Sequence, residues 1–236
     1  MKLKDRGRKI LCLFAGISGL MISGCTKAKY TWATEDEYFK VPIWKQHVRT
    51  FKKIKAKPHT VTLFIGDSIT EGFDLNRHLD QDSLVNMGIS GDFTSGVLRR
   101  LDIVKKLQPK KIFVMIGIND ILKNIPPERI KSQYGEIINT LIRDCPSSKL
   151  FIQSNLPTTG MGGSESNNVT YIREILLLNA FLRETCLNRG VTFIDLYPKF
   201  EFPKDQLNAD YTYDGLHLSD NGYKIWSDVI RPFVQE

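Results

Sequence analysis

The stretch TVTLFIGDSIT, Thr60–Thr70, joins a continuous apolar run to a small polar turn. Residues Thr60–Ile65 are mostly β-branched or aromatic, which predicts a strand buried on both faces of a sheet. Gly66 and Asp67 interrupt the apolar run, and Ser68 is suited to begin a helix. A buried strand that passes directly into a helix favours an α/β fold with a parallel sheet.

Working outward from this stretch, apolar runs and helical patterns alternate along the chain. Repeated strand–helix units predict a parallel sheet covered on both faces by helices. We expect strands at Thr60–Ile65, Leu84–Asn86, Lys111–Ile116, Lys149–Ser154 and Thr192–Asp195. We expect helices after Ser68 and at Ser95–Leu107, Pro127–Arg143, Asn168–Arg189 and Asn221–Phe233. The long irregular stretches Leu156–Asn167 and Pro198–Asp214 follow strands, at the edge where open α/β sheets bind ligands.

The N-terminus has the pattern of a secretory signal. Met1–Lys9 contains five basic residues, and Ile10–Ile22 is almost wholly apolar. This apolar run is shorter than the roughly 20 residues that a membrane span needs. It is followed by Ser-Gly-Cys25, and this end resembles a bacterial lipoprotein signal box. We expect residues 1–24 to be removed and Cys25 to carry the lipid that tethers the protein to a membrane of the bacterial cell envelope, outside the cytoplasm. An uncleaved anchor and a simple cleaved signal are the alternatives.

Without residues 1–24 the chain is only mildly basic. These residues hold five of the 33 Lys and Arg and one of the 26 Asp and Glu, so the remainder carries a formal net charge of +3. A nucleic-acid-binding protein would be expected to show a clustered basic face. The densest basic cluster, residues 52–57, is interpreted as a solvated helix end, with contact to an anionic surface as the alternative. No nucleic-acid partner is expected. Residues 25–58 are expected to form a tether and a helix at Glu35–Lys57, started or kinked by Pro42, and residues 59–236 to form one domain.

The remaining cysteines and the histidines favour neither a metal nor a cofactor. Cys145 and Cys186 lie on separate expected helices, where they can pair outside the cytoplasm or stay buried and free. The chain has no CxxC motif and only four histidines, so a zinc site has no support.

Four short blocks carry the groups that nucleophilic catalysis requires: GDSIT (66–70), GISGD (88–92), GIND (117–120) and DGLH (214–217). A serine hydroxyl is a weak nucleophile until a neighbouring base takes its proton. His217 is the candidate base, and Asp214 is close enough in sequence to reach its Nδ1 and leave Nε2 free for the Ser68 proton. The alternatives are a helix N-cap for Ser68, an ordinary histidine for His217 and an Asx-turn for Asp214.

Attack on a carbonyl creates an oxyanion, which needs hydrogen-bond donors already in place. The candidate donors are the N–H of Ser68, the N–H of Gly91 and the side-chain amide of Asn119. Asn119 comes directly after an expected buried strand, so its amide should project from the edge of the sheet toward Ser68. A turn-forming asparagine is the alternative. Gly91 permits a positive φ and a close approach of the substrate to the backbone.

Several other polar and aromatic residues are expected to have structural roles. Asp67 and Asp120 flank the candidate site, and each is expected to hold its loop by accepting backbone N–H groups. The same structural role is expected for Asp92, Thr94 and Asp195. The three tryptophans are too scattered along the chain to form a sugar-binding platform, and core packing is the expectation for Trp32, Trp44 and Trp226.

Taken together, the four blocks resemble those of the SGNH hydrolases, also called GDSL esterases. The four residues that name this family match Ser68, Gly91, Asn119 and His217. The segment NMGISGDFTSGVLRRL (86–101) is similar to the platelet-activating-factor acetylhydrolase branch and related bacterial lipoprotein esterases. The resemblance implies a flavodoxin-like three-layer α/β/α sandwich for residues 59–236, no cofactor, and ester hydrolysis through an acyl-serine intermediate.

The residues and the resemblance predict a serine carboxylic-ester hydrolase with the triad Ser68, Asp214 and His217. We expect it to remove short acyl groups, above all acetyl, from an extracytoplasmic glycan or a small ester, because no long apolar lid is evident in the sequence. A lysophospholipase or thioesterase and a non-catalytic acyl-glycan binding protein are the alternatives, since a fold and its motifs do not choose the substrate. Acyl transfer to a sugar hydroxyl is also open, and no oligomeric state is predicted.

Overall fold

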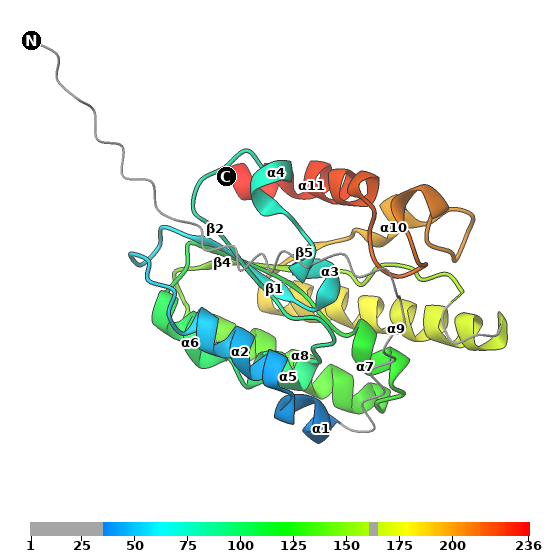
Figure 1. Ribbon diagram of the computed structural model, residues 1–236, viewed down its shortest axis with the longest axis horizontal. Coiled ribbons are helices and arrows are strands. Elements are labelled where there is room, and N and C mark those ends of the chain that lie inside the picture. The colour runs from blue at the N-terminus through cyan, green and yellow to red at the C-terminus, as the bar shows by residue number, and fades with distance from the viewer. Residues whose placement is uncertain (1–34, 161–164) are drawn as a thin grey trace, which may run out of the picture. The chain divides into compact units, whose positions relative to one another are not determined.

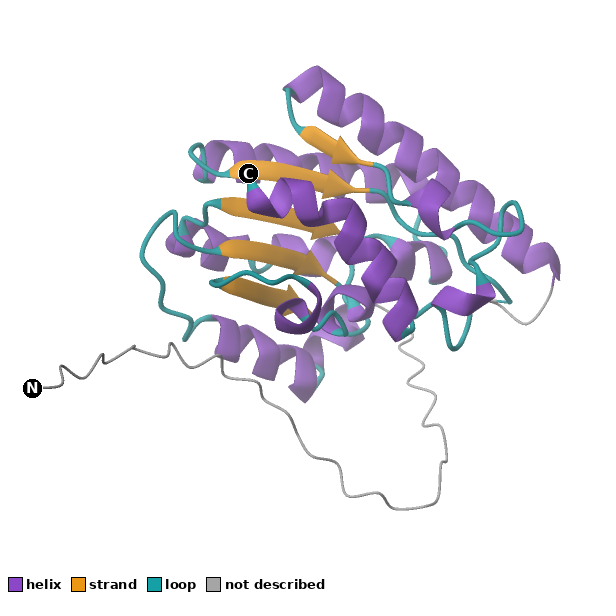
Figure 2. Ribbon diagram, turned by 90° about the horizontal axis from the view of Figure 1, so that it is seen from above, coloured by secondary structure: helices purple, strands orange, loops and turns teal. Residues whose placement is uncertain are grey.

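Five short parallel strands form the centre of the computed structural model, which describes residues 35–160 and 165–236. The strands are β1 (Thr62–Gly66), β2 (Leu84–Gly88), β3 (Lys111–Met115), β4 (Lys149–Gln153) and β5 (Thr192–Ile194). They lie in the order β2-β1-β3-β4-β5, and every neighbouring pair is parallel. All strand arrows in Figure 2 accordingly point the same way. This order is that of flavodoxin-like sheets, so the predicted fold class is confirmed.

Helices cover both faces of the sheet (Figure 1). On one face α8 (Pro127–Asp144) packs against α9 (Glu165–Arg189), and on the other α11 (Asp220–Gln235) contacts α4 (Leu75–His78). Helix α8 has proline at its first turn and an apolar stripe at helical spacing, as an amphipathic helix on a sheet should. The stripe consists of Ile130, Tyr134, Ile137, Ile138 and Leu141, all of which are buried.

A ladder of three aromatic rings crosses the sheet. Phe64 of β1, Phe113 of β3 and Phe151 of β4 are in register, with ring centroids 4.8 Å and 4.5 Å apart in nearly parallel stacks. The ladder faces α11, since the ring of Phe151 meets that of Phe233 at 5.6 Å. Such pairs contribute about 0.5–1.5 kcal/mol each beyond the area that they bury. The apolar runs that predicted strands therefore also join the sheet to its helical layer.

The N-terminal helix is interrupted at the proline. Instead of one helix over Glu35–Lys57, the chain forms α1 (Glu35–Lys40) and α2 (Pro42–Phe51). Val41 is extended, with φ −63° and ψ 135°, because the residue before a proline is sterically driven out of the helical region. The lysines that follow Phe51 are exposed, as expected, although they lie beyond the helix end.

The expected helix Ser95–Leu107 is also two helices, α5 (Thr94–Leu98) and α6 (Leu101–Leu107). The break falls at Arg100, whose φ of −124° is not helical and whose side chain is fully buried. Its guanidinium donates to the carbonyl oxygens of Met87 at 2.7 Å and Gly66 at 3.1 Å. These buried hydrogen bonds replace helical continuity at this position.

The remaining elements are short or close to expectation. The long helices α9 and α11 extend a few residues beyond the predicted Asn168–Arg189 and Asn221–Phe233. The short helices are α3 (Ser68–Glu71), α7 (Ile118–Leu122), α10 (Tyr197–Phe200) and the 3-10 turn η1 (Ala209–Tyr211).

Cys145 and Cys186 are both buried and free, so the disulfide alternative is wrong. Within residues 35–160 and 165–236, no helix has the length and apolar character needed to cross a bilayer. Residues 1–24, Cys25 and Trp32 lie outside the described part of the chain.

Gly66 provides a direct test of the turn between β1 and α3. A Cβ at this position would lie 2.1 Å from Thr70 Oγ1 and 2.4 Å from the carbonyl oxygen of Met115. We expect Gly66→Ala to lower the free energy of unfolding by about 1–3 kcal/mol or more, because the surrounding backbone must move. Urea denaturation measures this change.

The matched control is Gly135→Ala on α8, where an added Cβ meets nothing within 4 Å. This substitution should raise the free energy of unfolding by up to about 1 kcal/mol, because alanine has the higher helix propensity. Equal effects of the two substitutions would contradict the close packing at Gly66.

Candidate active site

Ser68 lies where β1 ends and α3 begins. It is the one residue of the stretch 61–70 that is not buried. The side chain of Asp67 accepts a hydrogen bond from the N–H of Ile69 at 3.0 Å and so caps α3. The loop-holding role predicted for Asp67 is thereby confirmed. The buried strand and this cap together present the Ser68 hydroxyl at the C-terminal edge of the sheet.

A chain of hydrogen bonds joins three residues that the sequence analysis singled out. The Nε2 atom of His217 lies 2.9 Å from Oγ of Ser68, and its Nδ1 atom lies 2.7 Å from Oδ2 of Asp214. Ser68 and His217 are 149 positions apart in the sequence. The imidazole therefore bridges the hydroxyl and the carboxylate, as general-base activation of a serine requires.

Asp214 uses its two carboxylate oxygens for two purposes. Oδ1 accepts the backbone N–H of Leu216 at 3.0 Å and that of His217 at 2.7 Å, whereas Oδ2 meets the imidazole. The turn role and the orienting role, considered as alternatives from the sequence, are thus both present. Partial burial alone would raise the pKa of Asp214, but the hydrogen bonds from the His217 side chain and from these two N–H groups outweigh it and hold the pKa below its ordinary value.

Residues that the sequence analysis did not single out hold the loop of Asp214 and His217. Thr212 Oγ1 donates to the carbonyl oxygen of His217 at 2.7 Å and accepts the N–H of Gly215 at 2.9 Å. Gly215 has φ +85°, and its carbonyl oxygen accepts the N–H of Thr159 at 2.8 Å. A threonine two positions before an aspartate is a possible turn signal, but the contact with Thr159 has no counterpart in the local sequence.

The three residues that carry the candidate oxyanion donors are partly exposed. Like Ser68, Asn119 is the one residue in its stretch, 111–120, that is not buried, and Gly91 is half-buried with φ +78°. Among the described residues, the backbone N–H groups of Ser68 and Gly91 have no hydrogen-bond acceptor. The amide of Asn119 donates to the carbonyl oxygen of Asp92 at 3.0 Å, which places it beside the Asp92–Phe93 peptide, directly after Gly91 and Asp92.

Of the other three aspartates expected to hold loops, Asp120 behaves as predicted. It accepts the N–H of Thr94 at 3.1 Å and also the Thr94 hydroxyl at 2.6 Å, and so joins α7 to α5. Asp92 goes beyond the prediction, since it accepts the side-chain donors of Trp44 and Arg100. For Asp195 the prediction is wrong, because its carboxylate forms an ion pair with the Arg183 side chain of the neighbouring α9.

Trp44 and Trp226 are buried, as expected for core residues, and each also donates an indole hydrogen bond.

A cavity of about 310 Å³ adjoins the Asp214 loop. The two long irregular stretches of the chain meet there, one after β4 and one after β5, as expected for ligand sites in open α/β sheets. The cavity is lined by Thr159, Leu207, Ala209, Thr212, Tyr213, Asp214 and Gly215. The ring of Tyr213 is largely exposed and stacks on the imidazole of His217, with centroids 5.8 Å apart.

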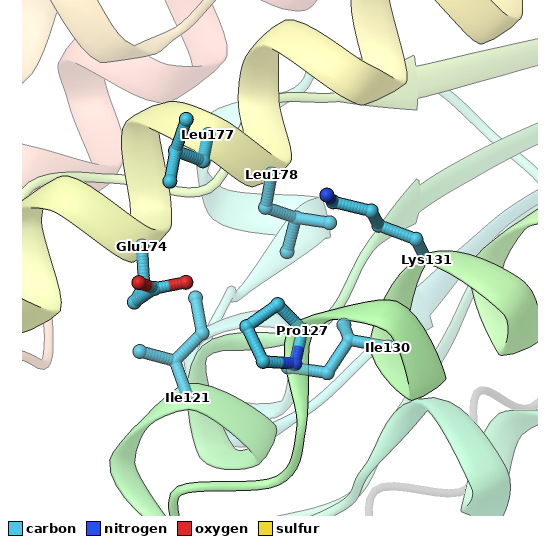
Figure 3. A pocket seen from close by; sticks show the side chains of 7 residues that line it. All are labelled: Ile121, Pro127, Ile130, Lys131, Glu174, Leu177 and Leu178. Atoms are coloured by element: carbon cyan, nitrogen blue, oxygen red, sulfur yellow. The ribbon is translucent and has the colours of Figure 1, made fainter.

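A second hollow, shown in Figure 3, lies between α7, α8 and α9. Its volume of about 10 Å³ leaves room for no more than one water molecule. Figure 3 shows the side chains of Ile121, Leu178 and Ile130 among those that line this space. The hollow is therefore a packing imperfection between helices. In the described part of the chain, no three His, Cys, Asp or Glu side chains are grouped as metal ligands would be.

The buried carboxyl of Asp67 predicts a pH dependence of stability. Burial raises the pKa of Asp67 to about 7. The hydrogen bond from the Ile69 N–H opposes this shift, and the negative charges of Asp92 and Asp120 add to it. Because this pKa exceeds that of the unfolded chain, the contribution to stability is complete below about pH 4 and is lost as the pH rises through 7.

Asp67→Asn keeps an acceptor for the Ile69 N–H but removes the charge. We expect its unfolding temperature to exceed that of the wild type at pH 8.5, with the difference disappearing near pH 4. Each unit of pKa shift corresponds to about 1.4 kcal/mol. Thermal unfolding followed by circular dichroism across this pH range tests the sign, and an advantage that grows toward acid pH would contradict it.

Parts of the chain are similar to known proteins. The model of the GDSL-like Lipase/Acylhydrolase family matches residues 64–225. An arylesterase of Vibrio mimicus is 28% identical over 110 residues, which are 40% of this chain and 54% of that protein, so the chain spans about half the length of this relative. The thioesterase 1/protease 1/lysophospholipase L1 of Escherichia coli is 26% identical over 151 residues, 56% of this chain and 72% of that protein.

The chain is also similar to a solved structure. A Streptococcus pneumonia protein named after platelet activating factor is 28% identical and superposes with a TM-score of 0.69, covering 81% of this chain and 91% of that one. The family match contains Ser68, Gly91, Asn119, Asp214 and His217. The resemblance found in the sequence is confirmed, and the chain belongs to the GDSL-like lipase/acylhydrolase family.

Proposed function

We propose that this protein is a serine carboxylic-ester hydrolase that works through an acyl-serine intermediate. The observation that carries the proposal is the continuous hydrogen-bond chain from Asp214 through His217 to Ser68, with distances of 2.7 Å and 2.9 Å. A protein that only binds esters has no need of a base beside a hydroxyl. Membership of an acylhydrolase family supports the same reaction.

In this mechanism His217 Nε2 takes the Ser68 proton as Oγ attacks the ester carbonyl carbon. The carbonyl electrons move to oxygen, and the resulting oxyanion accepts hydrogen bonds from the N–H groups of Ser68 and Gly91 and from the Asn119 amide. The intermediate then collapses, the ester C–O bond breaks, and the imidazolium gives its proton to the leaving alkoxide. Asp214 stabilises the imidazolium throughout.

Water completes the cycle. His217 takes a proton from a water molecule as the water oxygen attacks the acyl carbon. The bond between the acyl carbon and Ser68 Oγ then breaks, and the imidazolium gives its proton to Oγ. The acid is released and the free serine is restored. A sugar hydroxyl in place of water would give acyl transfer.

We propose short acyl groups, above all acetyl, as the part of the substrate transferred, and a glycan or small polar alcohol as the remainder. The cavity of about 310 Å³ beside Asp214 supports this choice, because it is at the lower end of the size usual for ligand sites and has two threonines and a carboxylate in its wall. The exposed ring of Tyr213 offers a flat apolar surface at its edge.

Hydrolysis of lipid acyl chains is the second candidate. It is favoured by the likeness to the Escherichia coli protein named thioesterase 1/protease 1/lysophospholipase L1.

Para-nitrophenyl esters of increasing acyl length distinguish these proposals. We expect kcat/KM to be greatest for acetate and to fall steeply beyond the shortest chains. Ser68→Ala should lower kcat by a factor on the order of 10⁶, as loss of the nucleophile does in other serine hydrolases. The matched control is Ser227→Ala, which removes a hydroxyl bonded only within α11 and should leave the rate unchanged. Preference for long chains would indicate lipid substrates, and no turnover of any ester would indicate a binding protein.

We further propose that Cys25 carries a lipid that holds the protein on a membrane of the cell envelope. The pattern of residues 1–25 supports this proposal. Cys25→Ser should move the protein from the membrane fraction into a water-extractable one, whereas Cys12→Ser, the same change within the apolar run, should not. Fractionation with detergent phase separation measures the difference. Retention of Cys25→Ser on the membrane would show that another segment anchors the chain.

A further inference from the structure

Helices α1 and α2 contact the loop that carries Gly91, although both precede the residues matched by the family model. The hydroxyl of Tyr38 donates to the carbonyl oxygen of Ser90 at 2.8 Å. The indole Nε1 of Trp44 donates to Oδ1 of Asp92 at 3.1 Å. Both side chains are buried. The N-terminal helices therefore hold the residue before Gly91 and the residue after it.

The geometry of the peptide bond gives the contact of Tyr38 a specific consequence. The carbonyl of Ser90 and the N–H of Gly91 belong to the same planar unit, and in a trans peptide they point in opposite directions. A hydrogen bond that holds the Ser90 carbonyl toward Tyr38 therefore directs the Gly91 N–H to the other side. The N–H has no acceptor among the described residues, so it is available to a substrate oxygen.

Arg100 and Asp92 connect the Gly91 loop to the segments that carry the other two candidate oxyanion donors. Arg100 binds Oδ2 of Asp92 through Nε at 3.1 Å and also holds the carbonyl oxygen of Gly66, two residues before Ser68. The carbonyl oxygen of Asp92 accepts the amide of Asn119. One oxygen of the buried Asp92 carboxylate is thus bonded to Arg100 and the other to Trp44, so its charge is paired and both oxygens have donors.

We propose that Tyr38 and Trp44 are positioning residues that orient the Gly91 N–H and the Asp92 carbonyl so that the oxyanion donors converge. This inference rests on the proposed ester hydrolysis. The N-terminal helices are then part of the catalytic apparatus, and the segment between the expected lipid anchor and the domain is more than a tether.

The test is Tyr38→Phe and Trp44→Phe, each of which removes one hydrogen-bond donor and keeps an aromatic ring. The controls make the same chemical changes elsewhere in the core. Trp226→Phe removes a buried indole donor that binds Gln153 at 2.7 Å. Tyr197→Phe removes a buried hydroxyl that has no hydrogen-bond partner among the residues that the structure describes. Thermal unfolding of all four variants measures any loss of stability separately from catalysis.

Loss of one oxyanion donor typically lowers kcat by about 10² to 10³-fold, and misorientation of a donor should cost a sizeable part of this. We expect Tyr38→Phe and Trp44→Phe to lower kcat at least about tenfold, with KM changed by less than about threefold. A trifluoromethyl ketone, whose serine adduct has an oxyanion, should bind more weakly by the factor lost in kcat/KM. Affinity for the carboxylate product should stay the same.

The two controls should retain kcat within about twofold even where they lower the unfolding temperature. The inference would be overturned if Tyr38→Phe and Trp44→Phe kept the kcat of the wild type. It would also be overturned if kcat fell in proportion to the unfolding temperature in all four variants. Either result would leave the proposed hydrolysis unaffected. A wild-type protein that hydrolyses no ester would overturn both.

Discussion

The buried ion pair between Asp92 and Arg100 is the interaction on which the rest of the site depends. Both side chains are fully buried, and Arg100 also holds the carbonyl oxygens of Gly66, the last residue of β1, and Met87, the last but one of β2. Removing one partner of such a pair typically costs about 3–5 kcal/mol, because the other charge stays buried without compensation. One guanidinium therefore holds together the loops that follow β1 and β2 at the edge of the sheet. Its position requires the helix to break at Arg100.

The Asp214 loop gives the other half of the site a similar rigidity by different means. One carboxylate oxygen closes a turn on two backbone N–H groups while the other orients the imidazole, so the loop conformation and the direction of His217 depend on the same side chain. Thr212 and the contact of Gly215 with Thr159 hold this turn against the chain that follows β4. Such preorganisation keeps a base at hydrogen-bond distance from its hydroxyl without reorganisation during the reaction.

The candidate nucleophile and most of the cavity wall come from different segments of the chain. The candidate nucleophile and oxyanion donors follow strands β1, β2 and β3, whereas the cavity wall comes from the stretches after β4 and β5, including the Asp214 loop. Loops of this kind vary more freely than the strands that they connect. Two relatives of this chain carry names that differ in the substrate, arylesterase and thioesterase 1/protease 1/lysophospholipase L1, which is consistent with this division.

The sequence by itself determined the strands and the identity of the candidate site residues, because both are encoded locally. A strand buried on both faces requires a continuous apolar run such as Thr62–Gly66, and the groups of a serine, a histidine and its aspartate have few chemical substitutes. Proline likewise marked the break before α2. Only the tertiary structure decided the break at Arg100, the ion pair of Asp195 and the hydrogen bonds of Tyr38 and Trp44. Each of these depends on a partner distant in the chain, 52 residues away for Tyr38 and 48 for Trp44, and no local pattern of hydrophobicity records which buried polar groups will meet.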